Sequence, residues 1–64
     1  MNYQVMFLRL KQVIEVTTLS KSSIYKRMSN GDFPKQISIG PQQVVWVKKD
    51  IDDWMNKQIQ SATL

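Results

Sequence analysis

Residues 19–31 constrain the fold more than any other segment, because they read as a short helix with a defined start and end. The hydroxyl of Ser20 can accept a hydrogen bond from an otherwise unpaired amide of the first turn. Asn30 and Gly31 both tolerate the left-handed conformation that ends many helices. Three apolar residues inside the segment have helical spacing and are predicted to face a core. They are Leu19, Ile24 and Met28.

The other side chains of this helix carry hydroxyls and cations, and no carboxylate lies between Ser20 and Asn30. A DNA major groove accepts such a surface, because hydroxyls and cations bind base edges and phosphates. Residues near the start of such a helix usually reach the bases, which favours Ser22, Ser23 and Lys26. Lys21 and Arg27 are then expected to meet phosphate. The alternative is an ordinary solvated helix face.

Length and composition predict one small domain, residues 1–64 with a core over 6–60. The chain has 64 residues, a 42% apolar fraction, no cysteine and no histidine. We therefore expect no disulfide, no metal site, no cofactor and no catalytic residue, so the chain is predicted not to be an enzyme. No apolar run approaches the roughly 18 residues of a membrane span.

Positive charge is concentrated in the first part of the chain. Residues 1–35 hold six cations and two acids, which gives +4, whereas residues 36–64 hold three of each, which gives zero. The excess lies on the half that contains the candidate DNA-binding helix, as expected for a nucleic-acid-binding protein. Arg9, Lys11 and Lys35 belong to this half, and each either contacts phosphate or is simply solvated.

The remaining pattern predicts a helix, helix, hairpin, helix order. Residues 3–8 are a short strand or an extended arm, and residues 10–16 a first helix that ends at 17–18. Residues 37–39 and 43–47 alternate like strands around a turn at 40–42. Residues 49 to about 60 form an amphipathic last helix. This order predicts a mainly α fold with a small β-hairpin, a winged helix-turn-helix.

The apolar pattern also predicts a core. We expect Val44 and Trp46 to share the core face of the hairpin with Ile37 and Ile39. Val45 and Val47 then lie on a second face, covered by the N-terminal segment or by the last helix. Trp46 and Trp54 are both expected in the core. Three acids are expected in the first turn of the last helix, where its dipole favours negative charge, followed by a frayed tail over 61–64. They are Asp50, Asp52 and Asp53.

Four segments resemble the AlpA-type prophage regulatory family. They read FLRLKQV at 7–13, TLSKSSIYKR at 18–27, GDFPK at 31–35, and VW at 45–46 with DW at 53–54. The family pattern is similar to FLRLKEV, TGLSRSTIYR and GEFPKP, and the resemblance spans residues 6–57. It implies a cytoplasmic, bacterial or prophage-encoded DNA-binding protein with a winged-helix or excisionase-like fold. Its members regulate integrase genes or act as excisionases.

The chain departs from this family pattern at two positions. Thr18 stands where the family usually has Gly, so the turn before the second helix is packed or angled differently. Gln42 stands where the hairpin tip usually carries Arg, so charge attraction to phosphate is lost. Gln42 and Gln43 therefore either contact DNA as a wing or form a plain turn. Tyr25 either bonds a phosphate or packs beneath the hairpin.

The expected partner is double-stranded DNA, with integrase or another copy on adjacent sites as additional partners. Within this class the chain is either a transcriptional regulator or an excisionase. The rival hypothesis is a protein-interaction module that inhibits another regulator and docks through the last helix, whose half of the chain has no net charge.

Overall fold

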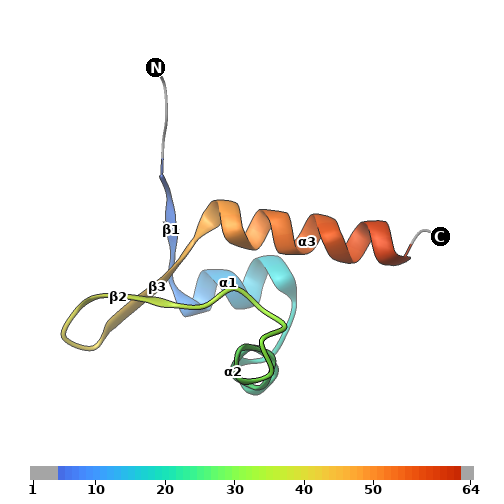
Figure 1. Ribbon diagram of the computed structural model, residues 1–64. Coiled ribbons are helices and arrows are strands. Elements are labelled where there is room, and N and C mark those ends of the chain that lie inside the picture. Colours follow the sequence, from blue (N-terminus) through green and yellow to red (C-terminus); the bar gives the residue numbers. More distant parts are fainter. Residues whose placement is uncertain (1–4, 63–64) are drawn as a thin grey trace.

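The computed structural model describes residues 5–62, which form three helices and a three-stranded antiparallel sheet (Figure 1). The predicted helices, the hairpin and a short first strand are confirmed. The elements are β1 (Phe7–Leu8), α1 (Leu10–Thr17), α2 (Lys21–Ser29), β2 (Ile37–Gly40), β3 (Gln43–Val47) and α3 (Lys48–Ala62). Figure 1 shows the β2–β3 hairpin projecting at one end and the end of α3 at the other. None of the helices in 5–62 has the length and apolar character needed to cross a membrane.

The sheet has the order β1-β3-β2, so the hairpin gains a third strand from the start of the chain. Leu8 lies opposite Trp46 in the β1–β3 pair, and the amide of Lys48 donates to the carbonyl of Met6 at 2.8 Å. The prediction of a strand within residues 3–8 is confirmed at 7–8, while residues 3 and 4 lie outside the described part. β1 thus ties the chain start to the junction between β3 and α3.

One apolar core joins the sheet to all three helices. Each helix contributes one fully buried side chain, and the sheet and the loop after α2 supply the rest. The core residues are Leu8, Val13, Ile24, Phe33, Trp46 and Ile51. Trp46 is fully buried as predicted, whereas Trp54 is half-buried and packs against the edge of this core.

The prediction for the two faces of the hairpin is wrong for β2, whose two isoleucines were expected on the core face with Trp46. Ile37 and Ile39 are 41% and 47% exposed, whereas Val45 is buried at 3%. The physical reason is the register: Ile37 lies opposite Val45, and opposed residues of an antiparallel pair share a face. That face is the one turned away from Trp46. β1 lies beside β3 and extends the sheet, and Phe7, opposite Val47, lies on this second face.

The start and end of the last helix also differ from the prediction. α3 begins at Lys48, so only Asp50 lies in its first turn. Asp52 and Asp53 lie one turn further along, where they pair with lysines instead of with the amides of the helix start. Helix continues through Ser61 and Ala62, which were predicted to be frayed, while residues 63 and 64 lie outside the described part.

Candidate nucleic-acid interface

Helix α2 begins after Ser20 and ends before Asn30 and Gly31, as predicted. The Ser20 hydroxyl accepts from the amide of Ser23 at 3.2 Å, which caps the first turn. Asn30 keeps a φ of −87°, and Gly31 alone takes the left-handed conformation, with a φ of 74°. The glycine therefore provides the change of direction into the loop that leads to β2.

One face of α2 is exposed and carries two ammonium groups, a hydroxymethyl group and a phenol. Ile24 lies on the opposite side and is fully buried, which fixes the direction in which the exposed face points. Four of the six residues of α2 that are predicted to bind DNA share this face, at helical spacing. They are Lys21, Ser22, Tyr25 and Lys26. We name this set the α2 face.

Tyr25 is 37% exposed and does not belong to the core cluster. Its position on the α2 face leaves the phenol available to a ligand that docks there. Lys21 and Lys26 are both exposed, and neither forms an ion pair within residues 5–62. The positive charge of this face is therefore uncompensated by neighbouring acids.

Ser23 and Arg27, the other two predicted residues, are half-buried at the edge of α2. The Nη1 of Arg27 lies 3.4 Å from Oδ2 of Asp32, and its guanidinium carbon lies 5.6 Å from the ring centre of Trp54. Arg27 thus lies outside the α2 face, and its side chain contacts Asp32 and Trp54 of the protein itself. Sequence spacing missed Asp32, because an acid in a loop gives no helical or strand pattern.

The turn before α2 is built around Thr18. Its φ of 62° is left-handed, and its amide donates to the carbonyl of Ile14 at 2.8 Å to close α1. A β-branched residue rarely adopts this conformation. The Thr17 hydroxyl supports the turn, because it donates to the carbonyl of Val13 at 2.7 Å and accepts from the amide of Leu19 at 3.3 Å.

The hairpin tip offers amide groups but no positive charge. Gln42 and Gln43 are both exposed, and Gln42 has a φ of 57° directly after Pro41. Such a positive φ is what a tight turn demands at this position. The tip can therefore donate and accept hydrogen bonds, but it cannot attract phosphate by charge.

The remaining candidate cations, Arg9, Lys11 and Lys35, have exposed side chains. Arg9 precedes α1, where its amide donates to the side-chain oxygen of Gln12 at 2.9 Å. This bond fixes the backbone of Arg9, and the residue remains exposed. These three positions thus present positive charge without belonging to the α2 face.

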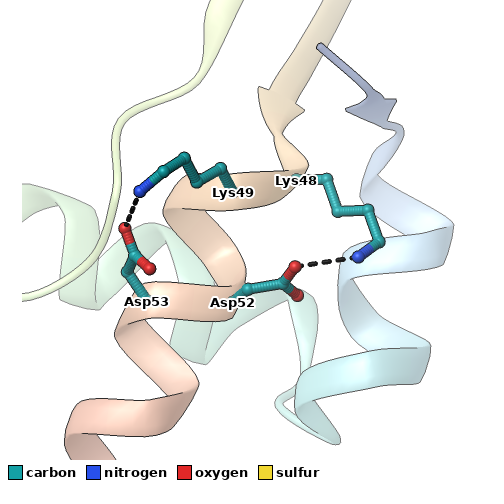
Figure 2. Close-up of polar contacts among 4 residues, drawn as sticks. All are labelled: Lys48, Lys49, Asp52 and Asp53. Carbon is teal, nitrogen blue, oxygen red and sulfur yellow. Dashed lines mark hydrogen bonds and ion pairs between the residues drawn. The ribbon is translucent and has the colours of Figure 1, made fainter. Parts of the chain in front are cut away.

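Two of the three lysines of α3, by contrast, are paired with acids. Lys48 Nζ lies 2.8 Å from Asp52 Oδ2, and Lys49 Nζ lies 2.9 Å from Asp53 Oδ2. Figure 2 shows the two pairs pointing to opposite sides of the helix. This local neutralisation leaves the α2 face as the more strongly positive surface. Within residues 5–62, no group of acids is arranged to hold a metal ion.

Comparison with known proteins finds similarity along most of the chain. The family of the prophage CP4-57 regulatory protein (AlpA) matches residues 6–59. An uncharacterized protein of Enterobacteria phage P4, ORF88, is 38% identical over 53 residues, covering 83% of this chain and 60% of ORF88. The DNA-binding transcriptional activator AlpA of Escherichia coli K12 is 30% identical over 60 residues, covering 84% of this chain and 86% of that protein. No solved structure matches.

Proposed function

The chain belongs to the AlpA family of prophage regulatory proteins, and from this premise we propose that it is a sequence-specific DNA-binding transcriptional regulator. AlpA proteins are regulators and not enzymes, in agreement with the sequence prediction. The proposed mode of action is that of a winged helix-turn-helix, in which α2 enters a major groove and the β2–β3 hairpin lies beside it as the wing.

The observation that carries this proposal is the α2 face. Lys21 and Lys26 are exposed and form no ion pair within residues 5–62, Ser22 and Tyr25 lie beside them, and α2 contains no acid. Hydroxyls and ammonium groups on one helix face match the donors and acceptors on base edges and the charge of the phosphates. The name of the E. coli relative, a DNA-binding transcriptional activator, supports the same ligand.

The roles within the α2 face follow from position along the helix. Ser22 and Lys26 lie four residues apart and are proposed to reach base edges. Lys21, at the first position of α2, is proposed to contact phosphate, with Arg9 and Lys11 contributing from around the start of α1. With about four to six phosphate contacts, log affinity falls with log salt at a slope of about −4 to −5.

The regulatory target that we propose is the DNA controlling integration and excision of the element that encodes the chain. A salt-titrated mobility-shift assay tests this, using DNA around the element's integrase gene and attachment site, with random DNA as competitor. We expect specific retardation that weakens steeply as salt rises. Weak binding that is equal on random DNA would contradict the proposal and favour a protein partner instead.

A further inference from the structure

Arg27 differs from the other cations of α2 in where its side chain is held. It is half-buried, and its Nη1 lies 3.4 Å from Oδ2 of Asp32. Its guanidinium carbon lies 5.6 Å from the centre of the Trp54 ring, within the range of a cation–π contact. Lys21 and Lys26, in the same helix, are exposed.

Arg27, Asp32 and Trp54 are also linked to one another through the backbone. The amide of Asp32 donates to the carbonyl of Arg27 at 2.8 Å, and Trp54 Nε1 donates to the carbonyl of Asp32 at 2.9 Å. Each pair of the three residues is thus in contact. We name this set the Arg27 clamp. It connects α2 and the loop after it to α3, which comes from a later part of the chain.

We propose that Arg27 is a positioning residue: it fixes how α2 is oriented on α3 and does not itself bind phosphate. This inference rests on the proposed function, because the orientation that matters is that of the α2 face toward DNA. The carboxylate of Asp32 offsets the charge of the guanidinium and repels a phosphate placed beside it. Lys26, the adjacent residue, already supplies an exposed cation at this level of the helix.

Helix α2 is short and is held in the core by few side chains. It is nine residues long, with one fully buried side chain, Ile24, and the half-buried Met28 packed against the core. A short helix held mainly by these two side chains can still rotate or tilt, which would displace Ser22 and Lys26 from base edges. The Arg27 clamp lies at the opposite end of α2 from the Ser20 cap and resists such a rotation.

Arginine suits this role better than lysine. Its planar guanidinium can lie over the indole and direct an N–H group to the carboxylate at the same time, which a single ammonium group does less well. Arg27→Lys keeps the charge but weakens the clamp, whereas Arg27→Gln removes both. The two variants therefore separate the effect of charge from the effect of position.

The test is a salt-titrated mobility shift on the DNA that the wild-type chain prefers, with circular dichroism to confirm that each variant is folded. The positioning role predicts that Arg27→Lys and Arg27→Gln both lose about tenfold in affinity, about 1.4 kcal/mol, with an unchanged salt slope. The matched control, Lys21→Gln, should lower the magnitude of the slope by about 0.9, because Lys21 is proposed to contact phosphate. Wild-type affinity for Arg27→Lys, with a slope lowered by about 0.9 for Arg27→Gln, would overturn the proposal.

Asp32→Asn provides a second test, because charge and positioning predict opposite changes in DNA affinity. Removing an acid near bound DNA should strengthen binding by charge alone, whereas loss of the Arg27 clamp should weaken it. We expect Asp32→Asn to bind DNA more weakly than the wild-type chain. Because both substitutions break the same clamp, we expect the double variant Asp32→Asn with Arg27→Gln to bind no worse than either single variant. Tighter binding by Asp32→Asn would exclude the positioning role.

A measurement without DNA separates this inference from the proposed function. The two indole N–H groups should give two signals in a nitrogen–proton correlation spectrum, and Arg27→Gln should shift that of Trp54 while leaving that of Trp46 in place. If the wild-type chain bound no DNA, the proposed function would fail and the DNA-positioning role with it, even with this shift observed. If the wild-type chain bound DNA and the Trp54 signal stayed in place, only the clamp would be wrong.

Discussion

The indole Nε1 of Trp46 donates a 3.1 Å hydrogen bond to the carbonyl oxygen of Pro34. Trp46 is fully buried in β3, and Pro34 lies in the loop that joins α2 to β2. The bond gives the polar atom of a core side chain a partner, as buried tryptophans require. Together with the bond from Trp54 to Asp32, it fastens that loop to the sheet and to α3.

We expect Trp46→Ala to destabilise the fold by about 3–5 kcal/mol, which is comparable to the whole stability of a domain of this size. Trp46→Phe keeps most of the apolar volume but leaves the Pro34 carbonyl without its partner, at a cost of about 1–3 kcal/mol. Urea unfolding followed by far-ultraviolet circular dichroism measures both. A Trp46→Ala variant with a wild-type unfolding midpoint would contradict the central place of this side chain.

The elements that local rules determine could be predicted from the sequence. Ser20 caps α2 because its hydroxyl reaches an amide three residues on, and Gly31 ends the helix because it takes a positive φ at little cost. The turn around Pro41 and Gln42 separates the two hairpin strands as expected. In these cases the residue that determines the helix end or the turn lies within a few residues of it.

Features that depend on contacts between different elements could not be predicted. Alternation in β2 and β3 shows that each strand has two faces, but it does not show which residues oppose each other. The register that places Ile37 opposite Val45 decides this, and with it which residues are exposed. The sequence pattern also does not predict that Phe33 belongs to the core. Phe33 is buried partly against Trp54 of α3, and the centres of the two rings lie 4.9 Å apart.

The same limit applies to the candidate site. Helical spacing identifies Lys26 and Arg27 as cations of one helix and assigns both to DNA. It cannot show that Asp32 and Trp54 lie beside Arg27, since Trp54 comes from another helix. The α2 face therefore holds four of the six α2 residues named from the sequence, and Ser23 and Arg27 lie outside it.

Lys26→Ala and Lys21→Ala should weaken DNA binding in different ways. Loss of a base contact at Lys26 should cost about 1–3 kcal/mol and relax sequence preference, whereas loss of a phosphate contact at Lys21 should weaken binding equally on all sequences. Mobility shifts on the preferred site and on single-base variants of it measure the difference.

Both lysines are exposed, so neither substitution should change the unfolding midpoint appreciably. Lys57→Ala, an exposed lysine in α3, serves as the control that removes one charge outside the α2 face. Unchanged binding by both Lys26→Ala and Lys21→Ala would rule out the assignment of α2 to the groove.

Thr18→Gly should stabilise the chain. The left-handed φ of 62° costs a β-branched residue roughly 1–2 kcal/mol, and glycine avoids this while losing about 0.5–1 kcal/mol through greater freedom in the unfolded state. We expect a net gain of about 0.5–1 kcal/mol in the free energy of unfolding. Thr17→Gly is the matched control, because it removes a helical residue and its bond to Val13, and it should destabilise. A less stable Thr18→Gly would mean that the threonine side chain supports the turn more than its backbone strains it.

Gln42→Arg should strengthen DNA binding if the hairpin tip acts as a wing. Gln42 has a φ of 57°, and arginine has the same backbone preference as glutamine there, so the substitution changes charge and leaves the turn unaltered. One added phosphate contact should make the salt slope steeper by about 0.9, so that the gain in affinity shrinks as salt rises. Gln58→Arg adds the same charge at an exposed position of α3 and should leave the slope near its wild-type value. An equal change in both variants would show that net charge, and not a wing contact, produces the effect.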